Sequence, residues 1–359
     1  MDRSDCVRAL DRLYNVAILK RLCEERTLAE LIDEKVAGGT RAPMHERLVG
    51  ARLFGLIRLV RESGVHAYER EIGYKEIQRQ LIIMIGVTGG LSSHEIVSLT
   101  GHEKAQVSRA IKPLEEAGLI ERERLRAKLT LLPPGKKIFD RIMTISRARD
   151  AALTAGIEAD DLKRFIAMTE ELTRHAATLY AEERRLSAEA GVIGACSAAA
   201  GPPAWPTGPD GRKPTPLLTP KLISLIAYLK RSAMLAYQRS HGLSHFQWQV
   251  LAIIGETPPV PLARLIVMMG RDKSQVGRTV AHLEQAGLIE RTRPTRRRDI
   301  MLEPTAKGAD FFQSLYDLAM RREDALWSGH DAAGRAFYIA TIDRLTVNAR
   351  DMLEKEEAA

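Results

Sequence analysis

The chain carries nearly the same stretch of sequence twice, and this duplication constrains its fold more than any other feature. The two copies read QVSRAIKPLEEAGLIERERLRAK, from Gln106 to Lys128, and QVGRTVAHLEQAGLIERTRPTRRR, from Gln275 to Arg298. The register holds upstream without a gap, where Leu56-Ile57 aligns with Leu225-Ile226. About a third of the aligned positions are identical, more than shared helix composition explains. Because the period is too long and the copies too few for a solenoid, the repeat indicates two fused copies of a complete domain.

Length and composition agree with a tandem architecture. The chain has 359 residues, enough for two or three domains, and 45% of them are hydrophobic. Residues 201–220 are rich in proline and glycine, which favours an extended tether between the copies. The expected organisation is an N-terminal helical arm at residues 1–43, a first repeat at 44–183, a linker rich in Pro, Gly and Ala at 184–219, and a second repeat at 220–359.

The charge balance and the cysteines bear on partners and location. Lys and Arg number 54 against 46 acidic residues, and the resulting net charge of +8 makes polyanions such as nucleic acid natural partners. The three cysteines, Cys6, Cys23 and Cys196, lack paired spacing and are expected to be free thiols. No signal peptide is evident, and no segment is apolar for the roughly 18 residues that a membrane span needs. We therefore expect a soluble cytoplasmic protein.

Each copy contains the spacing of a helix-turn-helix. In the first copy, Ser92-Ser-His-Glu95 offers an N-cap and an acidic first turn for a short helix that stops at Gly101, and a longer helix is predicted over Glu103 to Ala117. In the second copy, the short helix begins after Pro261 and stops at Gly270, and the longer helix covers Asp272 to Ala286, with Asp272 as a good N-cap. A short helix, a glycine turn and a longer helix are typical of this DNA-binding motif.

The longer helix of each copy has one apolar and one polar face. Val107, Ile111 and Leu114 form one stripe, which is repeated as Val276, Val280 and Leu283 and is predicted to face the core. On the opposite face, Gln can pair with adenine and Arg with guanine in the major groove. The candidate base-reading residues are Lys104, Ala105, Gln106, Ser108, Arg109 and Lys112 in the first copy, and Lys273, Ser274, Gln275 and Arg278 in the second.

A basic hairpin is predicted after each longer helix. Gly118 and Gly287 end the helices, and the residues that follow alternate as in a strand. The candidate phosphate or minor-groove contacts at the hairpin are Arg122, Arg124 and Arg126 in the first copy, and Arg293, Arg296, Arg297 and Arg298 in the second. The first copy lacks the triple-arginine tip, so the two halves are not expected to bind equally well.

Taken together, these motifs resemble the MarR family of winged-helix transcriptional regulators. The resemblance rests on the order of helices, the entry Gly242-Leu-Ser-His-Phe-Gln-Trp-Gln-Val-Leu251, the Leu-x-x-x-Gly-Leu-Ile-x-Arg run and the basic wing. It implies a mainly α fold with small β-hairpin wings, in which two tandem winged helix-turn-helix domains form a single-chain pseudo-dimer with an α-helical dimerisation layer. Two departures stand out: Arg296 replaces the usual wing Asp, and Pro113 is predicted to kink or shorten its helix.

The resemblance also implies a function: a sequence-specific regulator of double-stranded DNA, expected to be a repressor that a small aromatic acid or phenol releases. The implied ligand residues are Tyr237, Arg239, His241, His245 and Trp248, with Tyr68 and Arg70 in the first copy. A competing interpretation makes Trp248 a core residue and Arg239 a surface or dimer-interface residue. Because repeat one offers fewer aromatic residues, one functional pocket per chain is conceivable.

Other function classes find less support in the sequence. His241 and His245 lie four apart, but Gly242 between them argues against one helical face and no further ligands cluster nearby, so no metal site is expected. Without a phosphate-binding glycine loop or a catalytic motif, we expect neither an enzyme nor a cofactor. The alternative function is a tandem winged-helix scaffold that binds protein and does not read DNA specifically.

Overall fold

A computed structural model of the chain describes residues 47–100, 104–124, 127–194, 217–269, 272–293 and 300–358. The expected N-terminal arm, most of the expected linker, all three cysteines and the tips of both wings lie outside these residues.

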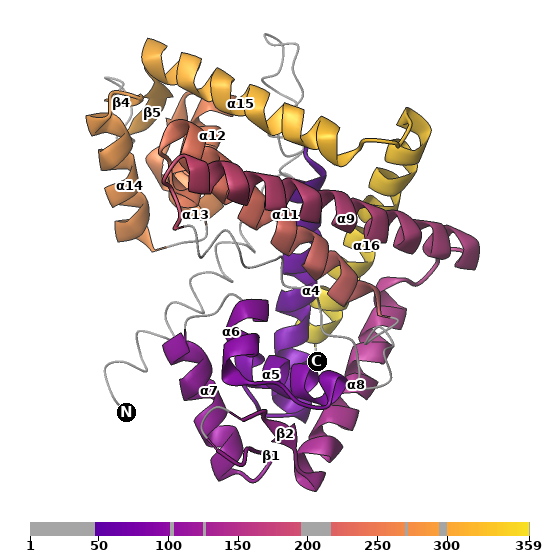
Figure 1. The fold of residues 1–359 in the computed structure, drawn as a ribbon. Helices are drawn as coiled ribbons and strands as arrows, with labels where there is room; N and C mark the ends of the chain where they lie inside the picture. Colours follow the sequence, from indigo (N-terminus) through magenta and orange to yellow (C-terminus); the bar gives the residue numbers. More distant parts are fainter. Residues whose placement is uncertain are drawn as a thin grey trace. The chain divides into compact units, whose positions relative to one another are not determined.

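The two repeats fold into the same succession of helices and wing strands, and the second repeat has one further short strand (Figure 1). The first repeat consists of α4 (Val49–Glu71), α5 (Glu76–Thr88), α6 (Ser93–Thr100), α7 (Lys104–Glu116), β1 (Ile120–Glu121), β2 (Thr130–Leu131), α8 (Pro133–Leu153) and α9 (Ala159–Glu189). The second consists of α11 (Leu218–His241), α12 (His245–Glu256), β3 (Val260–Pro261), α13 (Leu262–Met269), α14 (Lys273–Gln285), β4 (Ile289–Thr292), β5 (Met301–Pro304), α15 (Ala306–Leu326) and α16 (Ala332–Glu357).

Each repeat contains a winged helix-turn-helix domain with its own hydrophobic core. In the second repeat, the antiparallel wing pairs Thr292 with Met301, and β3 adds a third strand by pairing Val260 with Leu302. In the first repeat, β1 pairs with β2, and a single bridge between Leu91 and Leu129 takes the place of the third strand. The mainly helical fold with small hairpin wings is therefore confirmed.

The helix that follows each wing has a glycine near its start. This glycine lets the helix lie close to the backbone that follows α7 or α14. A Cβ atom on Gly308 would lie 1.7 Å from the carbonyl oxygen of Leu288, and one on Gly135 would lie 2.0 Å from that of Leu119. Each carbonyl directly follows the glycine turn that ends α7 or α14 and leads into the wing. Neither carbonyl can therefore move aside without disturbing the wing. Close packing at this point ties each wing to the helical layer.

Helices of the two repeats pack against one another in one layer, here named the central layer. Helix α11 of the second repeat packs along α9 of the first, and α16 of the second packs along α4 of the first. One hydrophobic core runs through all four helices. Within it, the ring of Phe165 on α9 stacks on that of Tyr338 on α16 with centroids 4.4 Å apart, and Thr169 shares a hydrogen bond of 3.0 Å with the Tyr338 hydroxyl. Each repeat therefore completes the core of the other.

A carboxylate from each repeat caps the opening helix of the other. Glu323 on α15 accepts a hydrogen bond of 3.0 Å from the backbone N–H of Val49, at the first turn of α4. Asp150 on α8 accepts the backbone N–H groups of Leu218 and Thr219, at the first turn of α11. A negative charge at a helix N-terminus satisfies free N–H donors and interacts favourably with the helix dipole.

Glu323 is the more deeply buried of these two carboxylates. It also accepts the indole N–H of Trp327 at 2.7 Å and lies 3.4 Å from Arg335. Burial nevertheless raises its pKa above the ordinary glutamate value.

Three details differ from the sequence prediction. Pro113 does not shorten its helix: α7 and α14 both contain 13 residues, because Ala110, Ile111 and Leu114 anchor α7 around the proline. Helix α9 continues past residue 183 to Glu189, where Arg185 pairs with carboxylates one turn away on either side. Helix α11 already begins at Leu218, within the predicted linker, because Asp150 caps that turn.

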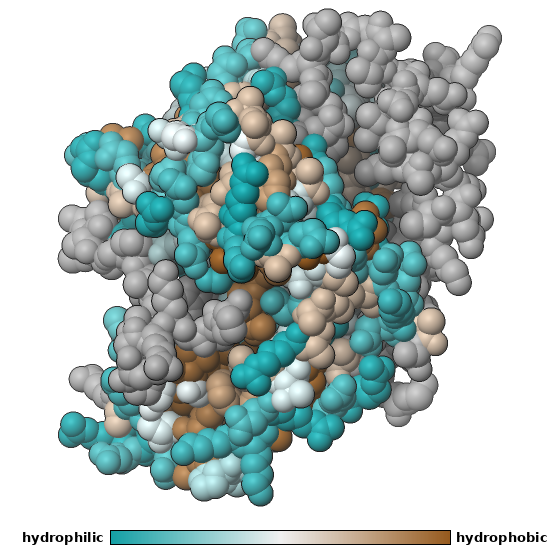
Figure 2. All heavy atoms as spheres, turned by 90° about the vertical axis from the view of Figure 1, so that its right-hand side faces the viewer, coloured by the Kyte–Doolittle hydropathy of each residue, from teal (hydrophilic) through white to brown (hydrophobic). Residues whose placement is uncertain are grey.

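The surface is mostly polar over the face seen in Figure 2, and hydrophobic side chains gather in a hollow at mid-height. Over the described ranges, every helix is too short or too polar to cross a membrane.

Gly308→Ala tests the close approach of α15. Because the added methyl group would meet a backbone carbonyl, the substitution should lower the free energy of unfolding by about 1–3 kcal/mol. Urea denaturation followed by circular dichroism measures the change. Gly55→Ala is the matched control, since its Cβ meets nothing within 4 Å and a helical Ala should stabilise by about 0.5–1 kcal/mol. Equal effects of the two substitutions would contradict the packing argument.

Glu323→Ala tests the cap between the repeats. The change leaves the Val49 N–H and the Trp327 indole N–H buried without this acceptor, so the free energy of unfolding should fall by about 1–3 kcal/mol. Glu323→Gln retains one acceptor oxygen and should lose less. The neighbouring Asp324 is exposed, and Asp324→Ala should change stability by no more than about 0.5 kcal/mol. Urea midpoints that match those of the Asp324 control would rule out a stabilising cap.

Candidate functional site

The second helix of each helix-turn-helix presents a polar face to solvent. Val107, Ile111 and Leu114 of α7 are buried, as are Val276, Val280 and Leu283 of α14, which confirms the predicted apolar stripes. The exposed candidates are Lys104, Ala105, Gln106, Ser108, Arg109 and Lys112 on α7, and Lys273, Ser274, Gln275 and Arg278 on α14. Asp272 caps α14 by accepting the backbone N–H groups of Ser274 and Gln275, as the sequence predicts. The candidate base-reading residues thus form one accessible face on each helix.

The wing residues divide into exposed and paired groups. Arg124 and Arg293 are exposed beside the wing tips, whereas Arg126, Arg296, Arg297 and Arg298 lie outside the described residues. Arg122, a predicted DNA contact, is paired within the protein. Its guanidinium binds the Glu115 carboxylate through two nitrogens, at 2.8 and 3.2 Å, so it joins the wing to α7.

The second repeat contains the equivalent ion pair between its wing and the preceding helix. Arg291 in β4 pairs with Glu284 in α14 at 3.1 Å. Because the pair recurs at equivalent positions, its shared role is to fix each wing against its recognition helix.

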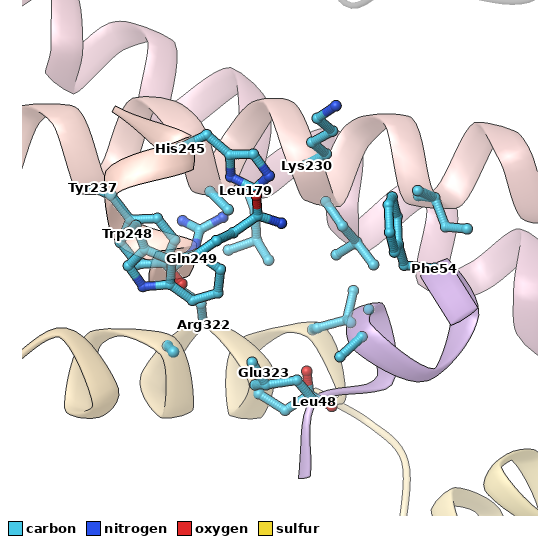
Figure 3. A pocket seen from close by; sticks show the side chains of 17 residues that line it. Leu48, Phe54, Leu179, Lys230, Tyr237, His245, Trp248, Gln249, Arg322 and Glu323 are labelled. Carbon is cyan, nitrogen blue, oxygen red and sulfur yellow. The ribbon is translucent and has the colours of Figure 1, made fainter. Parts of the chain in front are cut away.

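A cavity of about 250 Å³, here named cavity 1, lies between the central layer and the second winged-helix domain. Its walls come from α4, α9, α11, α12 and α15. Figure 3 shows Tyr237 and Trp248 at one end, Phe54 at the other, and His245, Lys230 and Gln249 between them. Both repeats therefore contribute to one ligand-sized hollow.

An aromatic stack dominates one end of cavity 1. The ring centroids of Tyr237 and Trp248 lie 4.7 Å apart, and the rings are within 9° of parallel. The ring of His245 also stacks on Trp248, with centroids 5.9 Å apart. Burial raises the pKa of the Tyr237 hydroxyl to about 12, so this group is neutral at physiological pH. The indole nitrogen of Trp248 is buried and has no hydrogen-bond partner among the described residues. Flat aromatic surface of this kind suits an aromatic ligand.

Arg322 brings positive charge to the wall of cavity 1. It donates a hydrogen bond of 2.6 Å to Ser232 and lies 3.9 Å from the buried carboxylate of Glu183 on α9. Desolvation lowers the pKa of its guanidinium, although the group stays charged near neutrality.

The structure places three predicted ligand residues away from the cavities. Arg239 binds Glu183 through two nitrogens, and Arg70 pairs with Glu356 at 3.2 Å, so both hold the opening helix of one repeat to the closing helix of the other. This position matches the competing interpretation of Arg239 as an interface residue. His241 shares hydrogen bonds with Ser240 and Ser314, and its ring meets the ring of Phe311 edge-on.

A second cavity of about 230 Å³, cavity 2, occupies the equivalent place in the first repeat. Tyr68 stands where Tyr237 stands in cavity 1, Arg79 stands where Trp248 stands, and Arg149 stands where Arg322 stands. The first turn of α11 closes cavity 2, as the first turn of α4 closes cavity 1. The two cavities are thus counterparts with different linings. In the part of the chain that the structure describes, no group of three metal-binding side chains gathers.

Sequence reasoning missed the residues that join the cavities to the central layer. These are the dipeptides Arg149-Asp150 and Arg322-Glu323, and the serines Ser63 and Ser232 that accept from the two arginines. The signal was available, because each dipeptide lies at the same distance after Gly135 or Gly308. The insertion in the second wing shifts the register at that point and hides the match.

Comparisons with known proteins found solved structures that are similar to parts of this chain. A search of curated proteins gave no match. Among solved structures, a MarR/EmrR family transcriptional regulator from Acinetobacter sp. ADP1 is 21% identical over 39% of this chain and 95% of its own, with a TM-score of 0.32. MarR from E. coli is 20% identical over 33% of this chain and 88% of its own, with a TM-score of 0.29. A MarR family regulator from Rhodococcus sp. RHA1 is 24% identical over 37% and 96%, with a TM-score of 0.29.

A family model locates the resemblance more closely than these superpositions do. The model of the MarR family matches the chain at residues 72–127 and again at residues 241–299. Each matched region contains the helix that follows the opening helix, the helix-turn-helix and the start of the wing. The chain therefore has two regions similar to the MarR family, one in each of its tandem winged helix-turn-helix domains.

Proposed function

We propose that the chain is a transcriptional regulator that binds a specific site on double-stranded DNA. The observation that carries the proposal is the pair of recognition helices, α7 and α14, each with an exposed Gln-x-x-Arg face and each inside a MarR-family match. In dimeric helix-turn-helix proteins, such helices enter successive major grooves about 10 base pairs apart. Here one chain supplies both helices on a shared helical layer, so one chain serves one operator as a pseudo-dimer.

The two recognition faces differ, which favours an imperfect palindrome as the operator. Ala105, Ser108 and Lys112 on α7 correspond to Ser274, Gly277 and Ala281 on α14. Side chains of different hydrogen-bonding capacity at equivalent positions prefer different bases. The test compares two palindromic operators, each built from two copies of one half-site. Equal affinity for both operators would contradict this part of the proposal.

We further propose that the regulator is a repressor that a small aromatic acid or phenol in cavity 1 releases from DNA. Helix α12 lines the cavity with His245, Trp248 and Gln249, and its opposite face lies in one hydrophobic core with α14. A ligand that bridges α12 and Phe54 on α4 would favour one orientation of the winged domain against the central layer. Such a ligand lowers DNA affinity only to the extent that it prefers the orientation that does not bind DNA.

One observation favours a second candidate function. Val267 and Met268 on α13 are exposed, at 39% and 45% of their full surface, and exposed apolar residues on a helix-turn-helix can contact protein. In a protein-binding scaffold, the recognition-face arginines would be dispensable.

Equilibrium binding to the DNA upstream of the chain's own gene, compared with an unrelated duplex of equal length, tests the regulator. Arg278→Ala should weaken site-specific binding by about 5- to 150-fold, the equivalent of ~1–3 kcal/mol for one lost base contact. Arg293→Ala should instead reduce the slope of log affinity against log salt by about 0.9, because it removes one phosphate contact. Lys163→Ala, an exposed change on α9, is the control. Weak binding that is equal for both duplexes and insensitive to Arg278 would favour the scaffold.

Phenol-dependent release from the same DNA tests cavity 1. Trp248→Leu removes the aromatic surface and the indole N–H but keeps an apolar side chain, so it should raise the phenol concentration needed for half-release by about tenfold or more. Arg79→Met, at the equivalent position in cavity 2, should leave the phenol response unchanged. An identical response from the Trp248 variant and the wild-type chain would place the effector elsewhere.

A further inference from the structure

The two recognition helices are held in their domains by equivalent contacts. The ion pair of Arg122 with Glu115 in the first repeat has its equivalent in Arg291 with Glu284 in the second. The residues that bury each helix also correspond one to one: Val107, Ile111 and Leu114 on α7, and Val276, Val280 and Leu283 on α14. Both helices lie at the left of the view in Figure 1. Each helix therefore takes the same place in its own domain.

The outward stripe of the two helices, by contrast, has diverged. Positions i, i+3, i+4 and i+7 of a helix share one face. On α7, these positions carry four exposed residues, Ala105, Ser108, Arg109 and Lys112. On α14, the equivalent positions carry four exposed or half-exposed residues, Ser274, Gly277, Arg278 and Ala281. The arginine is common to both stripes, and the other three positions differ.

Packing within the domains does not require these differences. A Cβ atom on Gly277 would meet nothing within 4 Å, so the domain leaves room there for a side chain such as that of Ser108. The ammonium group of Lys112 lies 3.7 Å from Glu116, one turn along the same exposed face. Such an exposed pair contributes little to stability, so the ammonium group is available to an acceptor on DNA. Because the helices are held alike, the differences act on what each outward stripe can contact.

The position of Lys112 and Ala281 distinguishes the two stripes most sharply. A lysine ammonium group donates hydrogen bonds and suits guanine O6 and N7, whereas an alanine methyl group suits the C5-methyl group of thymine. The position of Ala105 and Ser274 differs in the same way with the helices interchanged, because here α14 carries the polar side chain. A half-site that suits one stripe therefore presents unsuitable bases to the other at two positions, while the shared Gln and Arg read the same bases in both halves.

We propose that the chain binds a non-palindromic operator in a single orientation, and that the position of Lys112 and Ala281 sets this orientation. In a homodimer, the two-fold symmetry of the protein matches a palindrome, and interchanging the two subunits changes nothing. Here one chain carries two unlike stripes, so turning the protein around brings each stripe to the wrong half-site. This inference rests on the proposed function and adds a direction to it: the bound regulator distinguishes the two ends of its operator.

Selection from a pool of DNA duplexes with a random central segment supplies the binding site for the test. The sites recovered with the full chain should have the same bases in both halves where the shared Gln and Arg make contact. They should differ between the halves where Lys112 and Ala281 make contact, with guanine expected in one half and thymine in the other.

Cleavage of the recovered site by tethered iron-EDTA then reports the orientation. Glu121 and Glu290 are equivalent exposed residues in the two wings, and each is replaced by Cys in a chain whose three native cysteines are changed to Ser. The Glu121→Cys conjugate should cleave one end of the site about tenfold or more strongly than the other end. The Glu290→Cys conjugate should show the opposite preference.

Exchanging the two residues tests their assignment. The double variant Lys112→Ala with Ala281→Lys keeps the composition and net charge of the chain, and neither residue belongs to the hydrophobic core of its domain. It should lower the ratio of cleavage at the two ends by about fivefold or more, toward the reversed orientation. Lys163→Ala on α9 removes a distant exposed charge and should leave the ratio unchanged. An unchanged ratio in the double variant, with a folded circular dichroism spectrum, would overturn the role of this pair.

The outcomes separate this proposal from the proposed function. A pool in which no sequence is enriched would overturn both. A palindromic consensus, or equal cleavage of both ends by each conjugate, would overturn the single orientation and leave the regulator in place.

Discussion

Burial of one hydrophobic core by helices from both repeats is the interaction on which the rest of the structure depends. The opening helix of each repeat packs on the closing helix of the other, so neither repeat can cover its apolar surface alone. In a homodimer, this association weakens as the protein is diluted. In one chain, the linker turns it into an intramolecular event with a high effective concentration. The spacing of the two recognition helices therefore rests on folding and does not require a second chain.

The packing of helices from both repeats also closes the two cavities. Each cavity is closed by the first turn of the other repeat's opening helix, and a carboxylate of the cavity wall, Glu323 or Asp150, caps that turn. Any movement of a winged domain relative to the central layer must change these contacts. The close contacts at Gly135 and Gly308 also hold each wing against the helix that follows it.

Patterns within one repeat were predictable from the sequence, whereas partnerships between repeats were not. The buried stripe of α14, the Asp272 cap and the wing pairing follow from local periodicity and capping rules. The basic hairpin predicts a DNA contact for Arg122, and the resemblance to the MarR family implies ligand contacts for Arg70 and Arg239. The structure pairs them with Glu115, Glu356 and Glu183, and two of these acids lie in the closing helices, beyond the reach of any motif. Long-range pairing of this kind leaves no spacing signature.

The stacked rings of Phe165 and Tyr338 have a consequence for fidelity of assembly. They occupy equivalent positions in the two closing helices, and the Tyr338 hydroxyl is satisfied by Thr169, whose own counterpart is Ile342. If two chains joined through their second repeats, Tyr338 would face Tyr338 beside Ile342, and the threonine partner would be missing. A buried hydroxyl without that partner costs about 1–3 kcal/mol. The core is thus more stable when its two closing helices come from different repeats. This difference disfavours the joining of two chains through like repeats.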